Sequence, residues 1–131
     1  MTSLGQHLQA ADWKSEKHAP QISCAERVAA GQPLEIGLGV GQELSHPNTT
    51  EHHIRWIELH FKPMGGKFTF ALGRFEFEAH GESPKGPNEG PVYTVPHVTT
   101  HVVLKESGTL HAVSYCNIHG LWESAKPVTV E

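Results

Sequence analysis

The chain has 131 residues, a formal net charge of −4, eleven histidines and two cysteines. This length is typical of one domain, so we expect a single domain over residues 1–131. The acidic balance argues against nucleic-acid binding, because phosphate binding needs surplus Lys and Arg. No signal peptide is evident and no apolar run could cross a bilayer, so we expect a cytoplasmic protein without membrane association.

The histidine content is the feature of the composition that points to function. Histidine is the commonest metal ligand, and the eleven histidines are spread along the chain rather than gathered in a tag. The composition therefore favours a metal site without locating it. Cys24 and Cys116 can form one disulfide at most, and we expect both thiols to be reduced in the cytoplasm.

The N-terminal part of the chain, residues 5–22, predicts a short helical turn and then an irregular loop. The first strand is predicted over residues 33–41, where apolar residues alternate from Leu34 to Val40 and so share one face.

The next two predicted strands cover residues 54–61 and 67–79. The earlier one alternates cleanly, with Ile57 and Phe61 on the same face. The later one changes the parity of its apolar residues halfway along, so we expect a β-bulge near Gly73.

The C-terminal half begins with residues 80–96, whose turn-forming residues predict an irregular excursion. Strands are predicted over residues 99–104 and 110–115, and the short turn-like segment between them favours a hairpin. A last strand is predicted over residues 126–131. Several short strands separated by turns predict an all-β sandwich or barrel.

The sequence "SYCNIHGLWE" places His119 three residues after Cys116. A Cys-x-x-His pair can be a metal clip, a catalytic pair or an accident of composition. After a strand, such a turn can aim a sulfur and a nitrogen at one ion, with backbone N–H groups directed at the sulfur. The spacing alone is a weak signal.

Further candidate donors are His18, His46, His52 and His53, all near predicted strand ends and loops. That placement suits a metal site carried on the loops of a rigid sandwich. Only one of His52 and His53 should face a metal, since consecutive side chains of an extended chain point in opposite directions.

The donor types discriminate between metals. Structural zinc prefers four ligands rich in thiolate, which one cysteine and several histidines match poorly. Blue copper uses a sandwich and a C-terminal Cys/His loop, but neither Met1 nor Met64 follows His119 as its usual axial ligand would. Copper remains open through other axial ligands, and a nitrogen-rich set with one thiolate favours iron.

Three segments, "EKHAP", "HPNTTEHHI" and "CNIHGLW", together resemble superoxide reductase in its one-iron, neelaredoxin-type form. They occur in the family's order and at similar spacings, between residues 13 and 123. "AHGES" and "GPN" in the middle of the chain are also similar to the family. The larger relative, desulfoferrodoxin, adds an N-terminal four-cysteine iron domain that we do not expect here.

The resemblance implies a seven-stranded, immunoglobulin-like β-sandwich with an irregular N-terminal loop. It implies a mononuclear non-haem iron that alternates between Fe2+ and Fe3+, with four histidines in a plane, one axial cysteine and an open sixth position. The ligands that it implies are His18, His46, His52 and His119, with Cys116 axial.

The implied activity is the one-electron reduction of superoxide to hydrogen peroxide. Lys17 is expected to attract superoxide to the open position, and Glu16 is the candidate sixth ligand in the oxidised state. A donor such as rubredoxin is expected to return the electron, and the chain is expected to form a homotetramer. The alternative function is a non-catalytic iron or copper electron-transfer module.

Four other residues carry expectations of a simpler kind. Cys24 is expected to be a small packed residue and His80 to have a structural role in its turn. His53 is expected beside the site or at the surface, and Trp122 in the core, where it could shield the iron.

Overall fold

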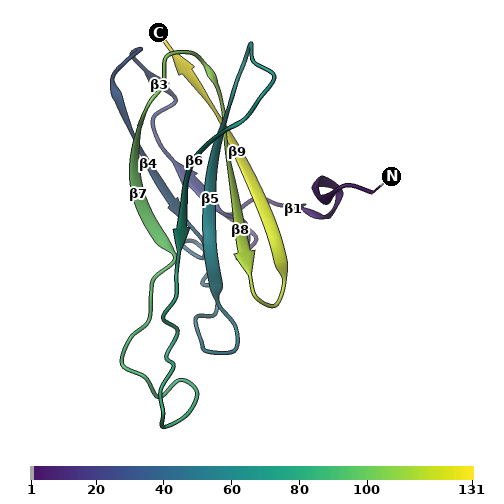
Figure 1. The fold of residues 1–131 in the computed structure, drawn as a ribbon, viewed down its shortest axis with the longest axis vertical. Helices are drawn as coiled ribbons and strands as arrows, with labels where there is room; N and C mark the ends of the chain where they lie inside the picture. The colour runs from purple at the N-terminus through teal and green to yellow at the C-terminus, as the bar shows by residue number, and fades with distance from the viewer. Residues whose placement is uncertain (1) are drawn as a thin grey trace.

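The computed structural model describes residues 2–131 (Figure 1). Within these residues a short 3-10 helix, η1 (Leu4–His7), precedes nine β-strands. The strands are β1 (Gln9–Ala10), β2 (Gln21–Ser23), β3 (Arg27–Val28), β4 (Pro33–Gly39), β5 (Ile54–Pro63), β6 (Phe70–Glu76), β7 (His97–Val103), β8 (Gly108–Cys116) and β9 (Gly120–Val130).

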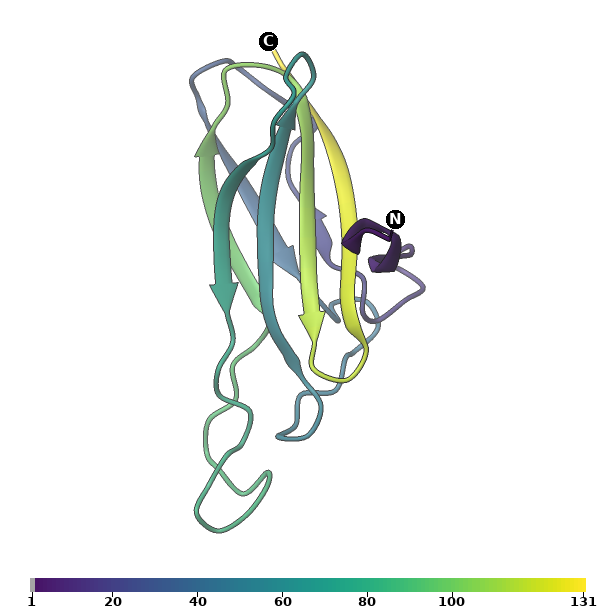
Figure 2. The same cartoon turned by 45° about the vertical axis from the view of Figure 1, so that its right-hand side comes forward.

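The strands form two sheets. One has the order β1-β9-β8-β5-β6, with β3 also paired to β9, and the other has the order β2-β4-β7. Figures 1 and 2 show the two sheets as the layers of a sandwich. The predicted seven-stranded, immunoglobulin-like β-sandwich is confirmed, with the two-residue strands β1 and β3 as additions.

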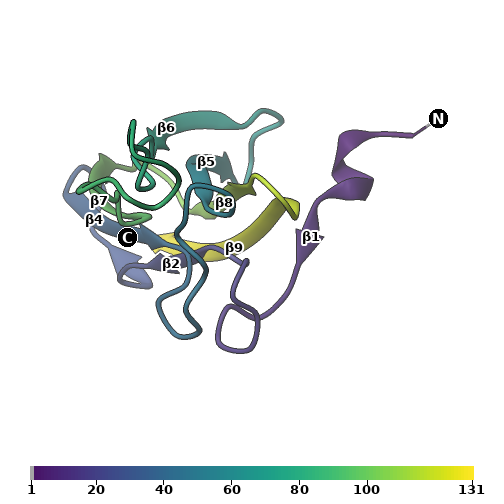
Figure 3. The same cartoon turned by 90° about the horizontal axis from the view of Figure 1, so that it is seen from below.

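The core lies between the sheets and follows the predicted alternation. On β4, Leu34, Ile36 and Leu38 are buried, and on β5 Ile57 and Leu59 are fully buried. Alternate side chains of both sheets thus interdigitate in one apolar layer, which is the usual core of a sandwich. The helical turn and irregular loop predicted at the N-terminus are also present, and Figure 3 shows this segment running out to the side of β9.

The bulge predicted near Gly73 is present. Leu59 pairs with Gly73 whereas His60 pairs with Ala71, so Leu72 is the extra residue of β6. The strand itself is shorter than the predicted residues 67–79 at both ends, and Phe68 lies in the turn before it, 75% exposed.

The predicted hairpin between residues 99–104 and 110–115 is wrong. Strand β7 pairs with β4 along its whole length, whereas β8 pairs with β5 and β9 in the other sheet. The connection crosses between the layers and buries Leu104 at the crossing. A short polar turn is compatible with either geometry, so the local sequence could not distinguish them.

Three connections meet at the end of the sandwich opposite the C-terminus: residues 40–53, residues 77–96 and the β8–β9 turn (Figures 1 and 2). Within residues 2–131, no helix is long and apolar enough to cross a membrane.

Candidate metal centre

The turn between β8 and β9 positions the cysteine clip. Cys116 and Gly120 are paired across the two strands, which leaves only three residues to close the hairpin. Gly120 has φ of 82°, a left-handed conformation that glycine adopts without strain and that such turns require. The turn directs the buried Cys116 sulfur inward, and the backbone N–H of His119 donates to it at 3.4 Å.

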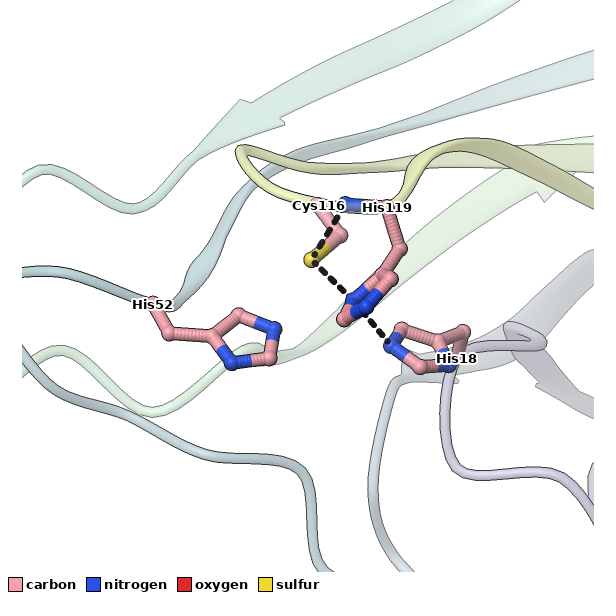
Figure 4. Close-up of side chains that lie close together, drawn as sticks. All are labelled: His18, His52, Cys116 and His119. Atoms are coloured by element: carbon pink, nitrogen blue, oxygen red, sulfur yellow. Dashed lines mark hydrogen bonds between the residues drawn. The ribbon is translucent and has the colours of Figure 1, made fainter.

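Four of the predicted donors converge at this turn. The donor atoms of His18, His52, Cys116 and His119 all lie within 4.8 Å of one another. Figure 4 shows the four side chains directed at a common centre. His18 Nε2 and His119 Nδ1 are 3.0 Å apart, although the two residues are far apart in the sequence. The arrangement concentrates three imidazoles and one thiol around a volume the size of an ion.

The fifth predicted donor, His46, lies beside this group. Its ring centroid is 4.9 Å from that of His18 and 4.8 Å from that of His52. Its Nδ1 donates to the carbonyl of Pro47 at 2.6 Å, which leaves Nε2 as the free nitrogen.

The unpartnered atoms of the cluster fit a metal. The Nε2 atoms of His46 and His52 are buried and have no hydrogen-bond partner within residues 2–131. Buried polar atoms normally have partners, so such orphans require an explanation such as an ion. Burial lowers the pKa of His46 to about 4, and burial is also the main cause that lowers the pKa of His52. Both rings are therefore neutral near pH 7 and offer a lone pair.

Glu16 lies against His18 rather than among the donor atoms. Its Oε1 accepts a hydrogen bond from the backbone N–H of His18 at 2.8 Å and lies 2.7 Å from His18 Nδ1. Burial acts to raise the pKa of Glu16, but the hydrogen bonds from His18 together with nearby charge hold that pKa below its usual value. The ionised carboxylate thus orients the His18 ring with Nε2 towards the cluster.

Lys17 is half-buried beside the cluster and belongs to no ion pair within the described residues 2–131. Burial lowers the pKa of His46 and His52 most, and the neighbouring histidines lower it further. The positive charge of Lys17 adds to this lowering. Its ammonium group therefore acts on the volume that the imidazoles surround.

Trp122 forms one wall of the site. Its ring stacks on His18, with centroids 5.0 Å apart and planes 15° apart, and its Nε1 donates to the carbonyl of His119 at 3.3 Å. The indole is buried, so it shields this side of the cluster from water.

The remaining histidine of the HH pair takes a different position. The His53 ring stacks on His80 with centroids 3.4 Å apart, and both side chains are buried. His53 Nδ1 donates to the carbonyl of Thr49 at 2.8 Å. The structure thus brings His52 into the donor group and leaves His53 outside it.

Neither cysteine forms a disulfide within residues 2–131. Cys24 is half-buried against the core, and burial raises the pKa of its thiol. Sequence reasoning did not single out Asn88 and Asn117, whose side chains are hydrogen-bonded to residues 50–53.

Comparison with known proteins identifies one protein family over almost the whole chain. The desulfoferrodoxin family model matches residues 10–125. A neelaredoxin from Megalodesulfovibrio gigas is 57% identical over 124 residues, which cover 95% of each chain. A superoxide reductase from Pyrococcus furiosus is 49% identical over 128 residues, which cover 98% of this chain and 99% of that one. A solved structure from Thermotoga maritima, 53% identical, covers 100% of this chain and 99% of its own with a TM-score of 0.98.

The fold and the site define a β-sandwich protein with a histidine- and cysteine-rich metal centre at one end. The chain belongs to the desulfoferrodoxin family. The enzyme class predicted from the sequence, superoxide reductase, is confirmed by these relatives. The predicted cofactor, non-haem iron, agrees with this family and with a donor group that can hold a metal.

Proposed function

We propose that the chain reduces superoxide at a mononuclear iron site with four imidazole ligands and one thiolate ligand. The proposed ligands are His18, His46, His52, His119 and Cys116. The observation that carries this assignment is that two of the buried side-chain atoms unpartnered within residues 2–131, Nε2 of His46 and of His52, lie at the converging donor group.

Two of the proposed imidazole ligands have partners that fix their rings. The carbonyl of Pro47 holds the proton of His46 on Nδ1, and Glu16 does the same for His18. Such partners fix the tautomer and the ring orientation, and they make the ligating nitrogen more basic. The backbone N–H of His119 donates a hydrogen bond to the Cys116 sulfur, and this bond stabilises the negative charge of the thiolate.

Bound iron supplies the electron that, together with two protons, converts superoxide to hydrogen peroxide. Superoxide is a small anion, and a cation at the mouth of a site raises its local concentration. Lys17 would attract the anion and order the water that delivers protons, and its electrostatic effect on His46 and His52 supports this role. Glu16 is the proposed sixth ligand in the oxidised state, for which its carboxylate would leave the His18 ring.

Electron return and assembly are part of the proposal. A rubredoxin-like donor would reach the site at the exposed edge of His119, the ligand nearest to solvent. A homotetramer would cover exposed apolar side chains such as Phe68 and Phe70.

Localisation and domain organisation complete the proposal. The free thiols of Cys24 and Cys116 suit a reducing cytoplasm. The family match over residues 10–125 supports one domain over residues 1–131.

Metal analysis combined with an absorption spectrum tests the proposed site. The expected result is one iron per chain and a visible thiolate-to-iron band in the oxidised protein. Stoichiometric superoxide should generate this band from the reduced protein without release of oxygen. A colourless protein that binds zinc through four ligands would contradict the proposal. A coloured protein that does not consume superoxide would favour the alternative, an electron-transfer module.

A further inference from the structure

Residues 46–53, here called the ligand loop, carry His46 and His52 between β4 and β5. The side chain of Asn117, in the β8–β9 turn, is bonded to this loop on both sides of His52. Its Nδ2 donates to the carbonyl of Glu51 at 2.8 Å, and its Oδ1 accepts from the backbone N–H of His53 at 2.8 Å. The backbone N–H of Asn117 also donates to the carbonyl of His53 at 3.2 Å.

Asn88 is bonded to the ligand loop from another direction. Its Oδ1 accepts from the backbone N–H of Thr50 at 2.8 Å, and its own N–H donates to Thr50 Oγ1 at 3.2 Å. Its Nδ2 donates to both carboxylate oxygens of Glu51, at 3.1 and 3.0 Å. Asn88 adopts a left-handed φ of 63°, which asparagine tolerates better than most residues.

The excursion that carries Asn88, residues 77–96, is bonded to itself and to the ligand loop. The hydroxyl of Tyr93 donates to the carbonyl of Asn88 at 3.2 Å, and Asn48 Nδ2 donates to the carbonyl of Thr94 at 2.9 Å. Glu51 is therefore held at its carbonyl by one asparagine and at its carboxylate by the other.

We propose that Asn117 and Asn88 are positioning residues that hold His52 against Cys116 and His119. The asparagines tie the ligand loop to the cysteine-bearing turn on one side and to the excursion on the other. Outer partners of metal ligands typically change metal affinity or activity by about 10- to 100-fold when they are removed. The role of the two asparagines in iron binding rests on the proposed function. Their hydrogen bonds are observed independently of it.

The two residues are suited to a test because neither belongs to the core. Asn117 is half-buried and Asn88 is exposed, so substitution leaves the apolar layer intact. Asn88→Gly removes the side chain and keeps the left-handed backbone. Asn117→Ala removes both side-chain bonds, and Glu89→Ala is the control, an exposed neighbour in the same excursion.

The first measurement is amide hydrogen exchange in the metal-free protein. Asn88→Gly should speed exchange at the Thr50 amide, and Asn117→Ala should speed exchange at the His53 amide, because each loses its acceptor. The Gln32 amide, which donates to the Ala29 carbonyl in the connection before β4 and outside the ligand loop, is the internal reference. Unchanged exchange at both amides would overturn the proposal whatever metal the protein binds.

The second measurement uses the reduced, iron-loaded protein and a ferrous chelator. Both variants should lose iron about 10- to 100-fold faster than the wild type and should shift the thiolate-to-iron band, with Glu89→Ala unchanged. Faster amide exchange with wild-type iron loss and an unchanged band would overturn the positioning role. If Asn117→Ala does not fold, the exposed Asn88→Gly decides alone. A wild-type chain that takes up no iron would instead refute the proposed function.

Discussion

Lys17 has both the position beside the donor cluster and the positive charge that attraction of superoxide requires. Burial lowers the pKa of His46 and His52 most, and the charge of Lys17 lowers it further, so the ammonium acts at short range on the cluster. Because it is only half-buried and unpaired within residues 2–131, its charge remains available to an approaching anion.

Lys17→Ala should therefore slow the second-order reaction with superoxide by about 10-fold at low ionic strength, the lower range for electrostatic steering. The difference from the wild type should shrink in high salt, because mobile ions screen the lost charge. Pulse radiolysis at two ionic strengths measures both effects. Lys14→Ala is the control, since the ammonium of Lys14 lies over the Trp13 ring, 5.6 Å from its centroid. Equal rates for Lys17→Ala and the wild type would remove the steering role.

At the scale of elements, the β8–β9 hairpin couples the sheet to the site. Its two strands are paired from Gly108 and Val128 to Cys116 and Gly120, so the turn inherits a fixed orientation from the central sheet. The left-handed Gly120 then lets the chain reverse within three residues and keeps the Cys116 sulfur inside.

Gly120→Ala should lower the free energy of unfolding by about 1–2 kcal/mol, because alanine at positive φ is strained. Gly31 provides a matched control: it also has φ of 82°, and an added Cβ at either glycine meets no atom within 4 Å. Urea unfolding should show similar losses for the two variants. Only Gly120→Ala should shift the thiolate-to-iron band, and a shift of the same size in Gly31→Ala would show that the effect is not local.

The elements differ in how well the sequence predicts them. Alternation over β4 and β5 identified the buried faces, because in a half-buried strand the side-chain period of two is visible locally. The parity change before Gly73 likewise revealed the bulge. The partner of β7 was mispredicted, since pairing with β4 depends on residues about 60 positions away that local patterning does not encode.

The residues of the site also differ in how well the sequence predicts them. Metal chemistry restricts the candidate donors to a few side-chain types, and the resemblance to superoxide reductase, rather than the local sequence, selected His52 over His53. The asparagines at positions 88 and 117 could not be predicted, since their bonds join segments 37 to 66 residues apart, and most of these bonds end on backbone groups that every residue possesses. Such contacts leave no compositional signature.

For the whole molecule, most of the core and the metal site occupy different places. The fully buried residues Ile36, Leu59 and Leu110 lie between the sheets, whereas the histidine donors lie on connections and Cys116, the last residue of β8, borders the core. We therefore expect stability and metal chemistry to be largely separable, as is common for sites carried on loops of a rigid scaffold.

Leu59→Ala should lower the free energy of unfolding of the metal-free protein by about 2–5 kcal/mol, through lost burial and the cavity left behind. Phe68→Ala, which shortens a side chain that is 75% exposed, should change it by less than about 0.5 kcal/mol. Denaturant titration compares the two, and the iron-loaded form of Leu59→Ala should keep its band. Similar losses for both variants would mean that Phe68 is buried in solution, for example between subunits.

The 3.0 Å approach of His18 to His119 joins residues that are 101 positions apart in the chain. Neither end of the chain can supply a complete pocket by itself, so the donor group exists only after β5, β8 and β9 have assembled. Maturation of the protein is thereby tied to folding: we expect the full donor set to hold its metal only in the assembled sandwich, with entry through the side where His119 meets solvent.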